Sequence, residues 1–188
     1  MIKTKILNKY TLNFTSDIIL LNDLYHISAL LTEFQKDYPN IDKWFLCKVY
    51  RGIFSGQRTI LLKKRNNQIL GLSILKHTDE ERKLCTLFVD KNFHGKGLGT
   101  ELMEESLEIL KCGHPIFTVS ANRISEFQSL IKKFNFSLYK LYPDYYRKGL
   151  TEYAFNGGLT VNKKISSNNW VHLTAIPLRP SAALHVGR

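Results

Sequence analysis

Apolar residues recur at helical spacing twice in the first third of the chain. The first set follows at intervals of four, three, four and three residues, which places it on one face of a helix: Leu20, Leu24, Ile27, Leu31 and Phe34. Ser16 or Asp17 is placed to cap this helix, and Pro39 ends it, since proline lacks an N–H group. A second helix is predicted over residues 41–54, with four inward-facing side chains: Ile41, Phe45, Val49 and Ile53.

The pattern then changes from helical spacing to short runs typical of strands. We predict strands over residues 59–64, 69–76 and 84–89, separated by polar turns, and a further strand near the N-terminus over residues 5–14. The run at 84–89 is apolar on both faces, which favours a central place in the sheet.

The second half of the chain alternates helices and strands. After a glycine-rich segment, apolar residues at helical spacing predict a helix ending near Gly113. A strand over 116–119 would lie parallel to the strand at 84–89, because a helix connects them in a βαβ crossover. A helix near 124–134 and a hairpin of strands 137–142 and 151–155 complete the predicted domain.

Composition places the chain among folded proteins. Hydrophobic residues make up 44% of the 188 residues and charged residues 23%, and no apolar run is long enough for a membrane span. The start of the chain lacks the apolar core of a signal peptide, and three dispersed cysteines form neither a disulfide framework nor a zinc motif. We therefore expect a cytoplasmic protein without a metal and without membrane contact.

The glycine-rich segment is the strongest chemical signal in the sequence. Gly95, Gly97 and Gly99 surround Lys96 directly before a predicted helix, where main-chain N–H groups and the helix dipole favour a phosphate group. The dinucleotide fingerprint does not fit, because Thr100 stands where its last glycine belongs. The P-loop does not fit either, since no Gly-Lys-Ser or Gly-Lys-Thr closes the segment.

The stretch LCTLFVDKNFHGKGLGTEL, residues 84–102, resembles the coenzyme A loop of the GNAT family of acetyltransferases. Its pattern is [QR]-x-x-G-x-[GA], and here His94 stands where glutamine or arginine is usual. The order of predicted elements over residues 5–157 is also similar to that family. The resemblance implies an α/β (α+β) fold: a mixed, mostly antiparallel central sheet, splayed at the coenzyme A cleft and flanked by helices.

The resemblance also implies acetyl-CoA as cosubstrate. Its pantetheine arm would pair with the main chain of the central strand, and its pyrophosphate would lie on the N–H groups of residues 95–100. The implied cofactor-binding residues are Leu87, Phe88, Val89, His94, Gly95, Lys96, Gly97, Leu98, Gly99, Thr100 and, as a rough counterpart of a frequent asparagine, Asn122.

The catalytic residues are not assigned by the sequence. Aligning Phe136 with the aromatic residue that usually ends the family's helix region places Ile131 where many members have a tyrosine acid. Tyr145 and Tyr146 lie in the predicted hairpin loop, where they could bind the acceptor. The strand at 84–89 holds no carboxylate, and the acids at 79–81 read as a solvated cluster, so we expect a water-mediated proton path.

The acceptor stays open at this stage. The leading hypothesis is an N-acetyltransferase acting on a primary amine of a small molecule, peptide or protein. A net charge of +11 also suits a toxin-like enzyme that acetylates aminoacyl-tRNA, and the isoleucine at 131 suits a non-catalytic acyl-CoA-binding module. We expect a monomer or homodimer. Residues 1–158 are predicted as the domain and residues 159–188, which contribute +4, as a basic, peripheral tail.

Overall fold

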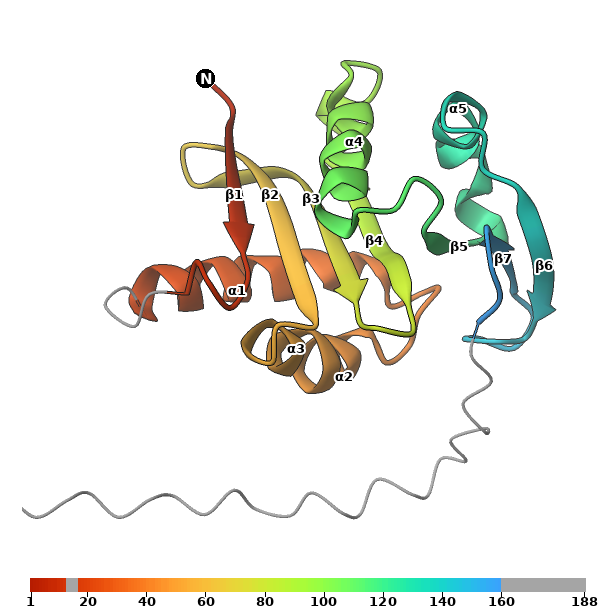
Figure 1. The fold of residues 1–188 in the computed structure, drawn as a ribbon, viewed down its shortest axis with the longest axis horizontal. Helices are drawn as coiled ribbons and strands as arrows, with labels where there is room; N and C mark the ends of the chain where they lie inside the picture. The colour runs from red at the N-terminus through yellow and green to blue at the C-terminus, as the bar shows by residue number, and fades with distance from the viewer. Residues whose placement is uncertain (13–16, 160–188) are drawn as a thin grey trace, which may run out of the picture. The chain divides into compact units, whose positions relative to one another are not determined.

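The computed structural model describes residues 1–12 and 17–159 (Figure 1). Met1–Gly158 forms one compact unit, and the predicted tail lies almost entirely outside the described residues. The unit is built on a 7-stranded sheet with the strand order β1-β2-β3-β4-β5-β7-β6. The bounds of the strands are β1 Lys3–Leu7, β2 Arg58–Arg65, β3 Gln68–His77, β4 Arg82–Val89, β5 Ile116–Ser120, β6 Leu138–Pro143 and β7 Thr151–Phe155.

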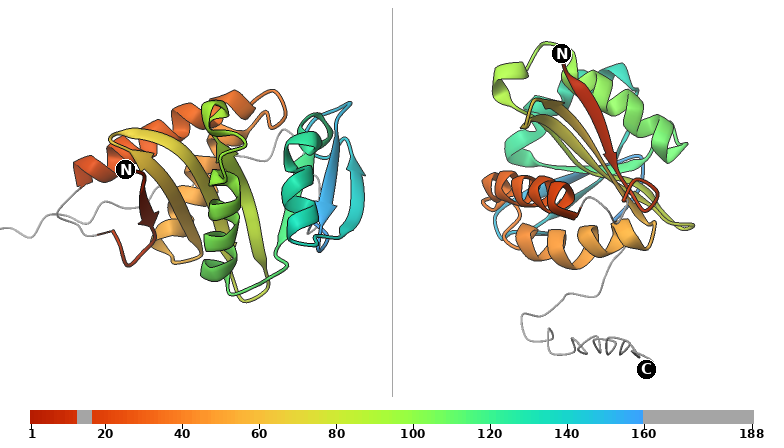
Figure 2. Two further views of the ribbon diagram at one scale, coloured as in Figure 1. Left: turned by 90° about the horizontal axis from the view of Figure 1, so that it is seen from above. Right: turned by 90° about the vertical axis from the view of Figure 1, so that its left-hand side faces the viewer.

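Helices cover both faces of the sheet (Figure 2). The main helices are α1 Asp17–Leu31, α2 Ile41–Trp44, α3 Arg51–Phe54, α4 Leu98–Leu110 and α5 Ile124–Lys133. The first three pack on one face over a core that includes Ile60, Leu72 and Ile74, and α4 and α5 pack on the other face over Leu75 and Phe117. Short 3-10 turns η2 Thr32–Phe34, η4 Lys91–Phe93 and η5 Ala121–Arg123 adjoin α1, α4 and α5.

The predicted elements are confirmed in order, and apart from the first strand their ends differ by a few residues. The helix at 41–54 is continuous, but its middle, η3 Phe45–Tyr50, is π-helical. All four residues predicted to face inward from it are buried: Ile41, Phe45, Val49 and Ile53.

The strand predicted over residues 5–14 is shorter than expected. It ends at Leu7, because the side chain of Asn8 accepts hydrogen bonds from the main chain of Tyr10 and Thr11 and forms a turn. Residues 13–16, which include the expected cap Ser16, lie outside the described part of the chain.

The sheet opens between β4 and β5, as the resemblance implies. These two strands are parallel, and their register is confined to Lys83 with Ile116 and Leu84 with Phe117. Beyond Leu84, the edge of β4 that faces β5 therefore has no strand partner among residues 1–12 and 17–159. On its other edge β4 pairs with β3, and a register shift leaves Cys85 as a bulge. The bulge and the splay together create an open strand edge in the middle of the sheet.

Candidate active site

The glycine loop presents unpaired main-chain donors at the start of α4. Gly95 and Gly97 have φ angles of +72° and +85°, which favour glycine, and a Cβ added at either would contact nothing within 4 Å. Within the described residues, the N–H groups of Gly95, Gly97, Leu98 and Gly99 donate to no acceptor. Such a cluster at a helix N-terminus is suited to an anion.

Three residues of the loop differ from Gly95 and Gly97 in their backbone geometry or in the use of their N–H group. Thr100 donates its N–H to the carbonyl of Gly97 at 2.9 Å, so this donor is already used. Leu98 is buried and anchors the helix, and only its main chain faces the loop. Gly99 has no positive φ, and an added Cβ would meet Val89 at an ordinary 3.6 Å, so backbone strain does not explain this glycine.

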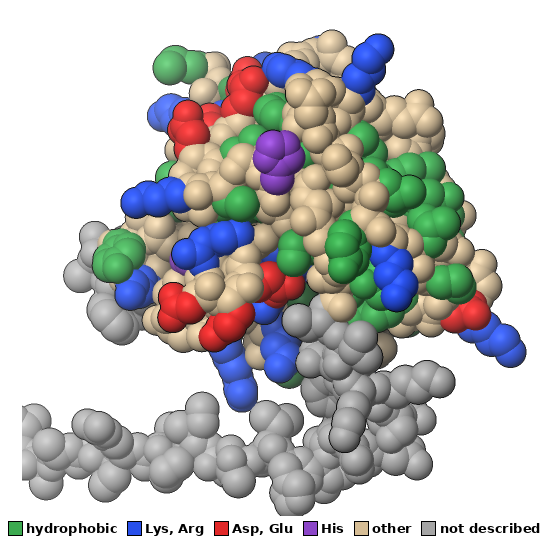
Figure 3. Space-filling view, turned by 45° about the vertical axis from the view of Figure 1, so that its right-hand side comes forward, with side chains coloured by type: hydrophobic (Ala, Val, Ile, Leu, Met, Phe, Trp, Pro, Cys, Tyr) green, Lys and Arg blue, Asp and Glu red, His purple; other side chains and the backbone are tan. Residues whose placement is uncertain are grey.

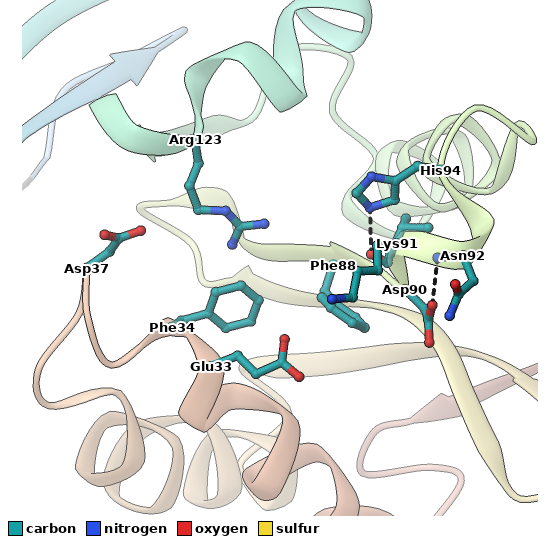
Figure 4. A pocket seen from close by; sticks show the side chains of 10 residues that line it. Glu33, Phe34, Asp37, Phe88, Asp90, Lys91, Asn92, His94 and Arg123 are labelled. Atoms are coloured by element: carbon teal, nitrogen blue, oxygen red, sulfur yellow. Dashed lines mark hydrogen bonds between the residues drawn. The ribbon is translucent and has the colours of Figure 1, made fainter.

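Short contacts hold the loop against the end of β4. Asp90 donates its N–H to the carbonyl of Leu70 at 2.8 Å, and its carboxylate accepts from the N–H of Asn92 at 2.8 Å. The Nε2 atom of His94 lies 2.9 Å from the carbonyl oxygen of Val89, to which it donates (Figure 4). Lys96 places its ammonium 5.2 Å from the ring centroid of Phe93.

A cavity of about 320 Å³ lies where the sheet opens (Figure 4). It is lined from three directions: by η2 and the segment that follows it, by the end of β4 with the start of the glycine loop, and by η5. The lining residues are Glu33, Phe34, Asp37, Phe88, Val89, Asp90, Lys91, Asn92, His94 and Arg123. Arg123 points into the cavity and lies over the ring of Phe34 at 4.5 Å. Phe88 and Val89, predicted to contact the cofactor, thus line this cavity, while Leu87 faces the core under α4.

Asn122 is tied to the opposite wall of the cleft. Its side-chain amide donates to Asp37 at 3.1 Å, and the hydroxyl of Ser120 donates to the other oxygen of the same carboxylate at 3.2 Å. The residue predicted to contact the cofactor therefore holds the segment after α1 against the end of β5.

The hairpin loop folds over the α1 side of the cleft. The ring of Tyr146 contacts the rings of Tyr38 and Tyr145 at centroid distances of 5.2 and 4.7 Å, and Arg147 donates to the main-chain oxygen of Lys36. Tyr145 and Tyr146, predicted to bind the acceptor, thus lie beside the segment that follows α1.

A buried carboxylate, Glu152 of β7, adjoins these tyrosines. Glu152 is 2% exposed, and the hydroxyl of Tyr38 donates to its two oxygens at 3.2 and 3.4 Å. Burial raises the pKa of Glu152 to about 7, with Asp37 adding to the rise, while hydrogen bonds from Thr118 and Tyr38 and the charge of Lys83 oppose it. Burial and the same carboxylate raise the pKa values of Tyr38 and Tyr146 above their usual range, so both stay protonated.

Sequence reasoning missed Glu152, because the expectation of a water-mediated path considered only the strand at 84–89 and the acids at 79–81. One signal was present in the sequence. Glu152 and Ala154 are two residues apart in the predicted strand, so an acidic residue shares one strand face with an apolar residue. In the structure this face is buried, and Ala154 is fully enclosed. The acids at 79–81 also need a correction: Glu81 is 9% exposed and pairs with Lys76, so it is not a solvated charge.

Comparison with known sequences decides the family. Residues 37–151 match the sequence profile of the acetyltransferase (GNAT) domain. The chain belongs to the GNAT family of acetyltransferases. As a GNAT protein it is an acyltransferase, and the loop, the splayed strands and the cavity lie within the matched residues or at their edge. A sequence comparison with curated proteins gives no match.

Solved structures share this GNAT fold at low sequence identity. An acyl-CoA N-acyltransferase from Pseudomonas aeruginosa is 16% identical, with a TM-score of 0.59, covering 82% of this chain and 98% of that one. ElaA from Escherichia coli is 15% identical, with a TM-score of 0.57 and coverages of 82% and 99%. A GNAT-family protein from Desulfovibrio desulfuricans is 12% identical, with a TM-score of 0.58 and coverages of 82% and 97%.

Two general features of the described residues complete the description of this GNAT domain. No helix among them is long and apolar enough to cross a membrane. In the same part of the chain, no group of three or more potential metal ligands is placed to hold an ion.

Proposed function

We propose that this enzyme transfers an acetyl group from acetyl-CoA to a primary amine. The proposal rests on two sets of main-chain groups that lack hydrogen-bond partners among the described residues. These are the N–H groups of the glycine loop and the edge of β4 beyond Leu84. A pyrophosphate suits the first set, and the amide groups of a pantetheine arm suit the second, in the manner of an added strand.

The proposed site contacts for acetyl-CoA follow from these groups. Leu87, Phe88 and Val89 offer their main chain, and the loop offers the free N–H groups of residues 95 and 97–99, with the ammonium of Lys96 nearby. The hydroxyl of Thr100, rather than its N–H, is available to the coenzyme. Because Asn122 is held by Asp37, we assign it to positioning the cleft walls and not to direct contact.

Glu152 is the proposed general base. The neutral amine attacks the thioester carbon, an N–C bond forms, and the C–S bond then breaks. The proton released by the amine nitrogen passes to the carboxylate of Glu152, and the thiolate of coenzyme A takes up a proton. A carboxyl group with a pKa of about 7 is half ionised at neutral pH, which suits a group that accepts and returns a proton. The protonated hydroxyl of Tyr146 is available as a donor to the thiolate, whereas that of Tyr38 already donates to Glu152.

The acceptor is proposed only as a primary amine, and an aminoacyl-tRNA remains one of the alternatives. On the face shown in Figure 3, Lys and Arg side chains are scattered and lie between acidic ones, so this face offers no continuous basic surface for nucleic acid. Thiol release from acetyl-CoA, measured with amino acids, polyamines, peptides and charged tRNA as acceptors, tests the function. Tight binding of acetyl-CoA without thiol release for any acceptor would instead support the non-catalytic alternative.

A further inference from the structure

Arg58, the first residue of β2, is a buried cation with an unusual set of partners. It is 9% exposed, and its Nη1 atom donates to the thiol sulfur of Cys85 at 2.9 Å. Its guanidinium carbon lies 5.7 Å from the ring centroid of Trp44. Among the described residues, no carboxylate lies within 4 Å of this guanidinium, and no other side chain accepts a hydrogen bond from it.

Two neighbouring lysines of the same strand, one buried and one half-buried, have anionic partners. Lys63, which is 4% exposed, pairs with Glu105 and Glu101, and Lys64 pairs with Asp23. A buried charge without an opposite charge is costly, and a guanidinium has five N–H donors, of which a thiol satisfies one weakly. Among the described residues no nitrogen of Arg58 is fully enclosed without a partner, so its remaining N–H donors reach solvent and are open to an added anion.

The bulge in β4 brings Cys85, the hydrogen-bond partner of Arg58, to the side of the sheet that carries the proposed catalytic groups. Cys85, the bulged residue, packs on the α1 side of the sheet, as do Trp44 and Tyr38. Tyr146 lies close enough to both Cys85 and Glu152 for each of them to influence its hydroxyl. Arg58 thus borders the same cluster of side chains as Glu152, on the face of the sheet opposite α4.

We propose that Arg58 binds an anionic group, a carboxylate or a phosphate, on the same acceptor molecule whose amine is acetylated. This inference rests on the proposed function and names its substrate class: amines that also carry an anion, as amino acids and aminoalkyl phosphates do. The planar guanidinium matches both anions through paired N–H donors, and Trp44 holds its plane in place. The ammonium end of such a molecule faces Glu152, so the charges of acceptor and site are complementary.

Matched acceptors test the inference through turnover. We would compare β-alanine, 4-aminobutyrate and 5-aminovalerate with propylamine, butylamine and pentylamine, and O-phosphoethanolamine with ethanolamine. For at least one chain length, wild-type kcat/KM should be roughly 10- to 100-fold higher for the anionic member, the scale of one charge-assisted hydrogen bond. The carboxylate and phosphate pairs distinguish the two anions. Equal kcat/KM values within every pair, or a preference for the neutral amines, would overturn the proposal.

Variants of Arg58 separate recognition from structure. Arg58→Gln should remove the preference between paired acceptors while acetyl-CoA binding is unchanged, and Arg58→Lys should retain part of it, since a point charge lacks the paired donors. An unchanged preference in a folded Arg58→Gln protein contradicts the inference. If this variant does not fold, the wild-type comparison still decides the outcome.

A binding measurement keeps the inference separate from the proposed function. Trp44 and Trp170 are the tryptophans of the chain, so a Trp170→Phe background leaves Trp44 as the only fluorophore of its kind beside Arg58. Titration with propionate and with inorganic phosphate should change Trp44 fluorescence saturably, and Arg58→Gln should abolish the change. Saturable binding without acetylation of any amine would reject the proposed function alone, and a flat titration with both anions would reject the role of Arg58.

Discussion

Replacing Glu152 by glutamine tests the central chemical claim, because it should have opposite effects on activity and stability. Glutamine preserves the size of the side chain and an acceptor for the hydroxyl of Tyr38, but it neither ionises nor accepts a proton. The carboxyl group has a pKa of about 7 in the folded protein against an ordinary value of 4.5. The folded state therefore binds this proton more tightly than the unfolded state does.

The sign of the stability effect follows from this difference. The contribution of Glu152 to stability is fully present below pH 4.5, and it is lost as the pH rises from 4.5 through about 7. A shift of this size corresponds to about 3 kcal/mol, an upper figure for the ionised carboxylate. At pH 8 the Glu152→Gln protein should thus be more stable than wild type by up to ~3 kcal/mol, and near pH 4.5 the two should differ little.

Urea unfolding of both proteins from pH 4.5 to 8 measures this difference, because the contributions of other titrating groups cancel between wild type and variant. Activity is measured as kcat/KM with one amine over the same range. With a base of pKa about 7 and an amine that must be neutral, the logarithm of kcat/KM should rise with slope two below pH 7 and slope one above it. The variant should lose ~10²- to 10⁴-fold activity and keep slope one throughout.

Two results would refute this reasoning. Parallel stability curves for wild type and Glu152→Gln between pH 4.5 and 8 would show that the carboxyl group does not titrate near neutrality. Activity of the variant within a few-fold of wild type, with an unchanged pH profile, would show that another group accepts the proton.

Three further changes test other parts of the structure. Gly97→Val should abolish saturable acetyl-CoA binding in calorimetry, while the circular dichroism spectrum remains that of a folded protein. Gly149→Val is the control, since Gly149 has a similar φ of +80° but lies in the hairpin loop between β6 and β7. Equal loss of binding in both variants would show that the glycine loop is not specifically required for binding. Glu81→Gln should lower the free energy of unfolding in urea by about 1 kcal/mol, because it leaves Lys76 without its partner. Glu80→Gln, at an exposed position, should not change it. A ~10³-fold loss of activity in either variant would indicate that the general base lies in this turn. Truncation after Gly158 should leave a cooperatively melting protein that binds acetyl-CoA, and loss of the cooperative melt would place the tail within the core.

Local sequence patterns determined most of the secondary structure and the conformation of the glycine loop. Helical spacing and alternation act over a few residues, so they predicted the inward face of the helix at 41–54 and the strands at 59–64 and 69–76 to within a few residues. The glycine loop could be predicted for the same reason. Gly95 and Gly97 adopt positive φ angles, which glycine favours, and the residues that follow them begin α4 with free N–H groups.

The tertiary structure decided what those patterns leave open, because burial and proximity depend on residues far apart in the chain. Glu152 becomes a base candidate because the fold buries it beside Tyr38, 114 residues earlier in sequence, and Asn122 donates to Asp37 across 85 residues. Nothing in the local sequence singles out Arg58; in the fold it is a buried cation whose guanidinium contacts Cys85 at the bulge and the ring of Trp44. The pKa of a carboxyl group and the pairing of a charge are properties of its packed surroundings, and only the fold supplies them.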